Sequence, residues 1–231
     1  MTATAERVDA ALAWLERRSS KRVREDMLSR YGITAPKAWG VPVGTIQQLG
    51  KQLGRDHDLA LALWPTGWYE ARMLCAFIDQ PERVTPAQMD RWVRDFDNWG
   101  ICDTICFHLF DRTPHAWKKL GPWSRRREEF VKRAAFALLA GLALHDKKAD
   151  DAAFLAALAL VEPAAVDDRN FVKKGVSWGL RVLGRRNRTL NAACLETARR
   201  LARSDQPAAA WIGRQAAKEL ASPAVRRKLR A

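Results

Sequence analysis

The chain has 231 residues, of which 48% are hydrophobic, enough for one compact domain or one array of helical repeats with a substantial core. It carries 40 Lys and Arg against 26 Asp and Glu, and this formal net charge of +14 favours a polyanionic partner. Nothing approaches the length of a membrane span, and the apolar run at 10–15 is too short for a signal peptide, so we expect neither.

The positive charge is concentrated towards the end of the sequence. From Asn170 to Ala231 there are 15 basic and 3 acidic residues, so +12 of the net +14 lies there. The four cysteines form no CxxC pair, and we expect buried free thiols rather than a zinc ribbon or a disulfide framework. The four histidines show no metal-ligand spacing, and we expect them to be structural.

Local patterns predict helices throughout, and the period-two alternation of strands is hard to find. The weakest region, 32–54, is rich in Gly and Pro around a possible short helix at 45–53. Thr85 followed by Pro86 predicts an N-cap and the first turn of a helix. Either Asp97 or Asn98 is expected to cap the next helix.

The second half of the chain is predicted to form a run of further helices. Pro163 should stop one of them, while Asp168 or Asn170 should cap another that ends at Gly184. The expected helices are 125–144, 151–161, 171–183, 189–202 and 207–220. The prolines expected between helices are Pro65, Pro81, Pro114, Pro122 and Pro163.

An internal repeat supports a modular architecture. The tetrapeptide Phe-Val-Lys-Arg at 130–133 recurs 41 residues later as Phe-Val-Lys-Lys at 171–174, and 70–74 looks like a degenerate third copy. Helix pairs with such a period are typical of HEAT and armadillo repeats, which stack into a curved solenoid. The sequence therefore predicts an all-α fold, an α-solenoid of HEAT-like repeats with a concave basic surface, over a single domain at 1–231. Arg133 and Lys174, at equivalent repeat positions, should point the same way.

The segment 95–104 combines an indole and a carboxylate in an unusually polar, acidic stretch of a basic protein. In a helix, Trp99 and Asp103 would lie one above the other on the same face. An electron-rich ring beside an anion suits a cationic ligand, and an alkylated purine in DNA is a cation attached to a polyanion. A packed Trp and a surface Asp remain the plain alternative for this pair.

Other candidate residues also have plain alternatives. Arg133 is either a helix-end charge or part of a site, and Trp178 is either a core residue or part of a site. The remaining tryptophans are most simply packing residues. The basic cluster Arg185, Arg186 and Arg188 is either a solvated turn, made tight by Gly184 and Asn187, or a set of phosphate contacts.

Motifs along nearly the whole chain resemble those of the AlkD-like DNA alkylation repair glycosylases, a family built from HEAT-like repeats. They are Arg-Tyr-Gly-Ile at 30–33, Trp-Gly-Val at 39–41, Trp-Tyr-Glu-Ala-Arg at 68–72, the segments 95–104 and 130–135, and 171–178. By these motifs the family's active-site Trp, Asp, Arg and second Trp correspond to Trp99, Asp103, Arg133 and Trp178. Gly100 stands where other members often carry a bulkier residue.

The resemblance implies an enzyme of base excision repair that hydrolyses the N-glycosidic bond of cationic N3- and N7-alkylated purines, such as 3-methyladenine and 7-methylguanine, in duplex DNA. It implies that the lesion is held against the concave surface, without a deep pocket for a flipped base. No metal or organic cofactor is expected, and the protein should be a monomer of the bacterial cytoplasm, nucleoid-associated when bound to DNA. The residues expected to contact DNA are Lys132, Lys173, Lys174, Arg185, Arg186 and Arg188.

Two other classes of function stay open at this point. One is a non-catalytic helical-repeat protein that binds DNA, RNA or a branched nucleic acid, which the basic C-terminal quarter would suit equally well. The other is a scaffold for an acidic protein partner, because helical solenoids often serve that way. Base release from methylated DNA separates both from a glycosylase.

Overall fold

The computed structural model describes residues 3–229, so the first two and last two residues of the predicted domain lie outside the described range. Every regular element in this range is a helix, as predicted. The chain divides into two compact units, Met1–Pro114 and His115–Ala231, and each is described by itself.

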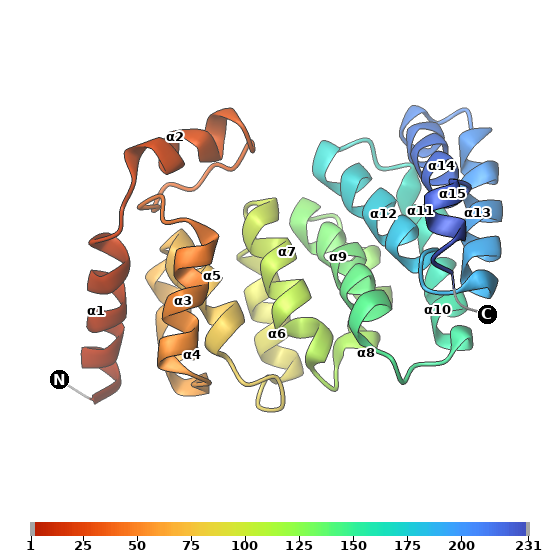
Figure 1. Cartoon of the computed structure of the whole chain (residues 1–231). Helices are drawn as coiled ribbons and strands as arrows, with labels where there is room; N and C mark the ends of the chain where they lie inside the picture. Colours follow the sequence, from red (N-terminus) through yellow and green to blue (C-terminus); the bar gives the residue numbers. More distant parts are fainter. Residues whose placement is uncertain (1–2, 230–231) are drawn as a thin grey trace. The chain divides into compact units, whose positions relative to one another are not determined.

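Unit 1 is built from helices that pack mainly on their neighbours in the sequence (Figure 1). The central helix α5 contacts α3, α4 and α7, and α1 packs on α4. The elements are α1 (Ala3–Glu16), α2 (Lys21–Ser29), α3 (Val43–Leu53), α4 (His57–Leu63), η1 (Trp64–Thr66), α5 (Tyr69–Ile78), α6 (Pro86–Arg94), α7 (Trp99–His108) and η2 (Phe110–Arg112).

Unit 2 continues the same local organisation. Its most extensive contacts join α9 to α12 and α13 to α14, and α12 also packs on α14. The elements are α8 (Ala116–Ser124), α9 (Glu129–His145), α10 (Asp151–Leu158), α11 (Val161–Ala165), α12 (Asn170–Leu183), α13 (Arg188–Ala202), α14 (Pro207–Leu220) and α15 (Pro223–Arg226). The repeated tetrapeptides begin α9 and α12, where the rings of Phe130 and Phe171 lie 5.5 Å apart.

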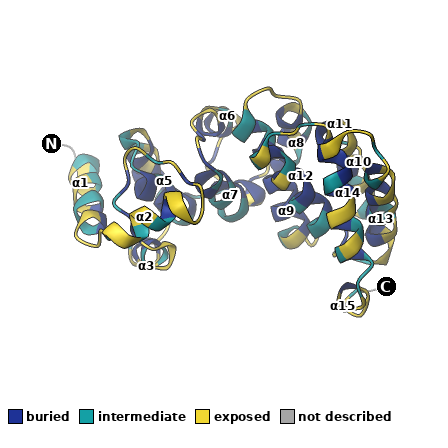
Figure 2. Ribbon diagram, turned by 90° about the horizontal axis from the view of Figure 1, so that it is seen from above, coloured by how far each residue is buried: buried dark blue, intermediate teal, exposed yellow. Residues whose placement is uncertain are grey.

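Apolar faces of the helices form the core of each unit. In unit 1, Trp64 and Trp92 are buried and stack with ring centroids 4.0 Å apart, which confirms their predicted packing role. Figure 2 shows the contrast between α2, which is largely exposed, and the mainly buried helices α5 and α9. All four cysteines are free and buried, as predicted.

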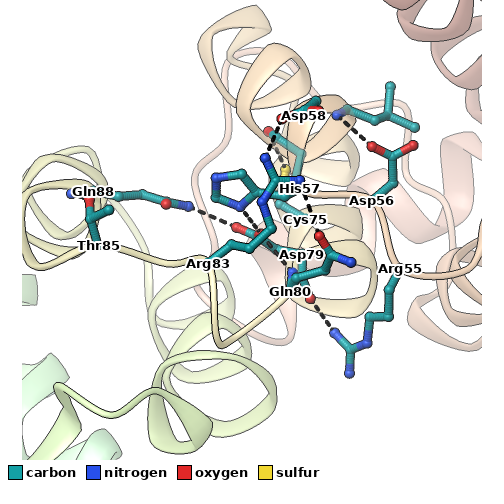
Figure 3. Close-up of polar contacts among 12 residues, drawn as sticks. Arg55, Asp56, His57, Asp58, Cys75, Asp79, Gln80, Arg83, Thr85 and Gln88 are labelled. Carbon is teal, nitrogen blue, oxygen red and sulfur yellow. Dashed lines mark hydrogen bonds and ion pairs between the residues drawn. The ribbon is translucent and has the colours of Figure 1, made fainter.

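A buried polar cluster joins three elements of unit 1 (Figure 3). His57 Nδ1 at the start of α4 lies 2.6 Å from Asp79 Oδ1 at the end of α5, and Gln88 of α6 donates to Asp79 Oδ2 across 2.7 Å. Burial raises the pKa of the Asp79 carboxyl, while the hydrogen bond from His57 opposes that shift. His57 therefore has the structural role that was predicted for it.

Most of the predicted helix starts are confirmed. Thr85 accepts a hydrogen bond from the Gln88 amide, and Asn98 accepts one from the Ile101 amide, so both are side-chain N-caps. The long apolar helix α9 begins at Glu129, later than the predicted 125. The expected short helix at 45–53 is α3, which starts two residues earlier.

Some of the local predictions were wrong. The N-cap position of α12 is Arg169, which makes no side-chain cap, and neither Asp168 nor Asn170 caps this helix. Gly184 does follow the end of α12, as predicted, but its φ of −69° means that it does not end the helix through a left-handed turn. Position 184 has no room for a side chain, because a Cβ there would lie 2.7 Å from the Leu220 side chain.

Two prolines lie inside helices, against expectation. Pro163 occupies the first turn of α11, where the missing N–H has no intrahelical partner to lose. Pro122 lies near the end of α8. Neither residue therefore separates helices as the sequence pattern suggested.

Candidate functional site

Helix α7 presents Trp99 and Asp103 on a partly exposed face. The Asn98 side chain fixes the start of the helix, because its Oδ1 accepts from the Ile101 amide at 3.0 Å while its Nδ2 donates to Asp97 Oδ1 at 2.7 Å. The opposite face is buried in unit 1 and carries Ile101, Cys102, Ile105 and Cys106. Trp99 and Asp103 are therefore one helical turn apart, with both side chains only partly covered.

The Trp99 indole is held by a loop that is distant in sequence. Trp99 Nε1 donates a hydrogen bond to the backbone oxygen of Tyr31 across 2.8 Å. Tyr31 itself is 51% exposed, and the Arg30 guanidinium lies 5.7 Å from its ring. The Tyr31 backbone thus contacts the indole, while the Tyr31 side chain is exposed.

Sequence reasoning missed Tyr31 as part of this site. The residue stands in the Tyr-Gly-Ile motif at 31–33, but no spacing rule connects it to a helix that begins 68 residues later. The family resemblance of the motif was the only signal that pointed to it.

Glu70 supports the loop that follows Tyr31. Its side chain is fully buried, and Oε1 accepts hydrogen bonds from the amides of Gly40 at 2.7 Å and Val41 at 3.2 Å. Gly40 has φ +79°, and a Cβ there would lie 2.4 Å from the Ser20 carbonyl oxygen. The Trp-Gly-Val and Trp-Tyr-Glu-Ala-Arg motifs therefore form one structural joint.

Two stacked rings complete the joint between these motifs. Trp39 and Trp68 stack with centroids 3.7 Å apart and planes within 6°. The loop from α2 to α3 is consequently fixed at its far end, which gives the Tyr31 carbonyl a defined position relative to α7.

Gly100 has a steric reason to lack a side chain. A Cβ at this position would lie 2.6 Å from Tyr69 Oη and 3.2 Å from Ile33 Cδ1. Burial raises the pKa of the Tyr69 hydroxyl, and the nearby carboxylates of Glu70 and Asp97 raise it further, so this hydroxyl stays neutral. The glycine lets α7 approach α5 closely next to Trp99.

One carboxylate of the acidic segment has a structural partner within unit 1. Asp95 Oδ2 accepts a hydrogen bond from Trp64 Nε1 at 2.7 Å, and its backbone oxygen accepts from Arg72 Nη1 at 3.2 Å. The Arg72 guanidinium also lies 5.2 Å from the Trp64 ring. Asp95 is exposed, and these contacts fix it at the end of α6.

In unit 2, Arg133 is buried between α9 and α12. The side chain is only 6% exposed, and Nη1 donates to the Phe171 carbonyl at 2.6 Å. Gly175 makes room for it, because a Cβ there would lie 3.1 Å from Arg133 Cγ. Arg133 thus contacts the face of α12 that also carries the partly exposed Trp178, one turn beyond Gly175.

The repeat did not give Arg133 and Lys174 the same surroundings. Lys174 is exposed on α12, whereas Arg133 is enclosed by that helix. Their different exposure reflects the packing of α12 on α9, which encloses Arg133 through Phe171 and Gly175. That both point the same way stays a prediction.

The lysine before Arg133 belongs to an ion-pair cluster. Lys132 Nζ lies 2.7 Å from Asp167 Oδ2, and Arg169 bonds the same carboxylate through Nε at 2.9 Å and Nη2 at 2.6 Å. The hydrogen bonds from Arg169 lower the pKa of Asp167 well below its usual range, and those from Lys132 add to the effect. Lys132 therefore has its charge compensated within unit 2.

The basic residues near α12 and α13 have different environments. Arg186 donates to the carbonyls of Ala143 at 3.0 Å and Ala149 at 3.1 Å, so it ties α12 to the end of α9. Arg185 lies 3.3 Å from the Glu219 carboxylate. Arg188 is exposed at the first position of α13.

A further aromatic contact lies on α14. Lys173 Nζ is 5.2 Å from the ring of the partly exposed Trp211, one turn before the exposed Arg214. Both α14 residues lacked a motif in the sequence, and only the packing of α12 on α14 brings them beside Lys173.

A model of the DNA alkylation repair enzyme family matches residues 11–220, which cover both units. The chain belongs to this family. One solved structure similar to it is described as "A new family of proteins related to the HEAT-like repeat DNA glycosylases with affinity for branched DNA structures". The similarity has a TM-score of 0.74 at 18% identity, over 92% of this chain and 95% of that one. No curated protein matches the chain.

The structural similarity confirms the predicted all-α, HEAT-like fold of this DNA alkylation repair family member. Its four predicted catalytic residues are divided between the units, with Trp99 and Asp103 in unit 1 and Arg133 and Trp178 in unit 2. Within residues 3–229, no helix is long and apolar enough to cross a membrane. The same range contains no group of three His, Cys, Asp or Glu side chains placed to hold a metal ion.

Proposed function

We propose that this DNA alkylation repair family member is a DNA glycosylase that releases cationic N3- and N7-alkylated purines, including 3-methyladenine and 7-methylguanine, from duplex DNA. In this proposal the two units act as a single glycosylase domain. The observation that carries it is the Trp99–Asp103 pair, one turn apart on a partly exposed face of α7. Membership of the family over residues 11–220 supports the same conclusion.

The chemistry needs little more than charge stabilisation and a positioned water. Alkylation at N3 or N7 makes the purine cationic, and the N-glycosidic electron pair leaves with the base, which becomes neutral. Positive charge then develops on the deoxyribose as an oxocarbenium ion. In this mechanism Asp103 acts as a carboxylate, which stabilises that charge and orients the water whose oxygen bonds to C1′. The water's proton passes to the carboxylate or to solvent.

The indole of Trp99 is proposed to lie against the deoxyribose of the lesion. Its hydrogen bond to the Tyr31 carbonyl fixes the ring plane before DNA binds, so little rotamer freedom is lost on binding. The exposed Tyr31 ring is proposed to add a second aromatic surface next to it. The two rings exclude water from the side of the sugar while Asp103 faces the developing charge.

Residues of unit 2 are proposed to hold the DNA backbone. Trp178 would contact the backbone as the second aromatic group, and Arg133 supports α12 at Phe171 and Gly175 beneath it. Lys174, Arg185 and Arg188 are the exposed members of the predicted phosphate contacts. The positive electrostatic potential that attracts DNA also includes Lys132, Arg185 and Arg186, although their charged groups already have partners.

The proposal is tested with duplexes that each carry one lesion. Release of 7-methylguanine and 3-methyladenine, detected as strand cleavage at the resulting abasic sites, is the expected result. Uracil and hypoxanthine should stay in place, because an uncharged base needs protonation by a general acid and Asp103 is assigned an ionised role. Release of uracil at a comparable rate would contradict the mechanism.

A second candidate is structure-specific binding of branched DNA without chemistry. It is favoured by the solved structure described above, whose family is said to have affinity for branched DNA. Comparing affinity for a three-way junction with that for a linear duplex of the same length tests it. Preference for the junction together with no base release would favour this candidate over the glycosylase.

A further inference from the structure

Unit 1 contains a cavity of about 430 Å³ at the C-terminal ends of α3, α5 and α7. The side chains that matter for its chemistry are Gln47, Lys51, Arg55, Phe77, His108 and Arg112. This volume lies within the range of small-ligand sites. Trp99 begins α7 and His108 ends it, so the cavity is about 14 Å along the helix from the indole.

Three cations line the cavity, and none of the described residues lining it is Asp or Glu. Lys51 is exposed and makes no hydrogen bond or ion pair with any residue that the structure describes. Its ammonium group lies in the last turn of α3, near the partial negative charge of that helix end, and is not paired with a carboxylate of the described residues. A cluster of positive charges attracts an anion, and guanidinium and ammonium groups together are typical of phosphate sites.

The two arginines are held in place by helix ends. Arg112 Nη1 donates to the carbonyl of His108, the last residue of α7, across 2.7 Å. Arg55 Nη1 donates to the carbonyl of Asp79, which follows α5; Figure 3 shows the Arg55 side chain reaching this backbone position. Each arginine satisfies a carbonyl that the helix leaves unpaired and keeps other N–H groups for a ligand.

An aromatic pair forms another part of the wall. The rings of Phe77 and His108 lie 5.2 Å apart and are tilted by 57°. Gly50 allows α3 to come close at this point, because a Cβ there would lie 2.8 Å from Phe77 Cβ. Both rings are partly exposed, so they offer a π surface beside the cations.

We propose that this cavity binds one phosphate-bearing nucleotide, either free or as a unit of a DNA strand. The phosphate lies among Lys51, Arg55 and Arg112, and the base packs against Phe77 and His108. Base–aromatic stacking beside cations is the usual way to hold an unpaired nucleotide without reading its sequence. This site is separate from the Trp99–Asp103 pair and does not depend on glycosylase activity.

The experiment uses the full chain and four probes: dAMP, deoxyadenosine, inorganic phosphate and a 12-nucleotide single strand with a 5′-phosphate. Isothermal calorimetry should detect dAMP binding, with deoxyadenosine and inorganic phosphate each at least about tenfold weaker, since each lacks one half of the contacts. Lys51→Glu and Phe77→Leu should each weaken dAMP binding by about tenfold. Arg91→Glu, a charge reversal at an exposed residue of α6, is the matched control and should change nothing.

The probes separate the two sources of the nucleotide. Binding of dAMP as tight as that of the strand assigns the site to free nucleotides, whereas tighter binding of the strand assigns it to DNA ends or gaps. Equal affinity for dAMP and inorganic phosphate, or equal effects of Lys51→Glu and Arg91→Glu, would overturn the nucleotide site. Asp103→Asn should retain dAMP binding, so this result is independent of the proposed glycosylase. Thermal melts of each variant check that it is folded.

Discussion

The Trp99 indole donates its only N–H to the backbone oxygen of Tyr31, 2.8 Å away, and so ties the start of α7 to the loop after α2. The bond fixes the orientation of an aromatic ring that is only partly buried. A carbonyl acceptor is independent of the Tyr31 side chain, so the position of the indole depends on the loop backbone. The joint of Glu70, Gly40 and Val41 holds the later part of that loop.

Trp99→Phe should keep an aromatic surface but lose the hydrogen bond to Tyr31. Loss of one such bond is worth about 1 kcal/mol, so base release should fall by about fivefold. In Trp99→Ala, which also removes the ring, the rate of base release should fall much further. Single-turnover release of 7-methylguanine measures both, and equal rates for the two variants would show that the ring is not used.

Asp103→Asn should abolish most base release while DNA affinity stays within a few-fold of wild type. The side chain keeps its shape but loses the charge that opposes the oxocarbenium ion, which should cost about 10²–10³ in rate. Glu82→Gln removes one exposed carboxylate elsewhere in unit 1 and serves as the control. Excision by Asp103→Asn within a few-fold of wild type would assign the carboxylate role to another residue.

Gly100→Ala should destabilise the protein by about 1–3 kcal/mol, because its methyl group would overlap Tyr69 Oη. Tyr69→Phe removes that hydroxyl, so the double variant should recover part of the loss. A double-mutant cycle from urea unfolding measures the coupling. Additive effects of the two substitutions would show that the hydroxyl is not the obstacle.

Arg186 and Arg188 should respond differently to substitution. Arg186→Gln loses two bonds to backbone carbonyls and should lower stability by about 1–3 kcal/mol with little change in the salt dependence of DNA binding. Arg188→Gln removes an exposed charge and should reduce the slope of log K against log salt by about 0.9. An unchanged slope would mean that Arg188 does not contact phosphate.

Asp167→Asn should lower stability at neutral pH by about 1.5–3 kcal/mol, because Arg169 and Lys132 lose a charged acceptor. The pKa of Asp167 is lower in the folded protein than in the unfolded chain. Its contribution is therefore present above about pH 4 and is lost as the pH falls through the folded pKa. Melts of both proteins from pH 7 to pH 2 should converge in acid, and a constant difference would contradict this account.

Local sequence signals predicted the helices well, because caps and apolar periodicity act within a few residues. Thr85 and Asn98 are N-caps whose side chains bond amides three residues ahead, and such contacts can be read from the sequence. Gly184 was likewise predicted at the end of α12, whereas the prediction that Pro163 stops a helix was wrong. The steric need for glycine at position 184, however, is not a local signal. Gly184 is required by Leu220, which lies far away in the sequence.

The sequence by itself determined the all-α repeat fold and placed Trp99 and Asp103 on one face of a helix, because spacing along a helix follows directly from its period. Only the tertiary structure decided which charged and aromatic groups are available. Arg133 and Arg186 are committed to backbone carbonyls of other helices, while Tyr31 lies beside Trp99 across 68 residues of chain. Such contacts depend on which helices pack together, and the residue pattern within a single helix does not predict its packing partners.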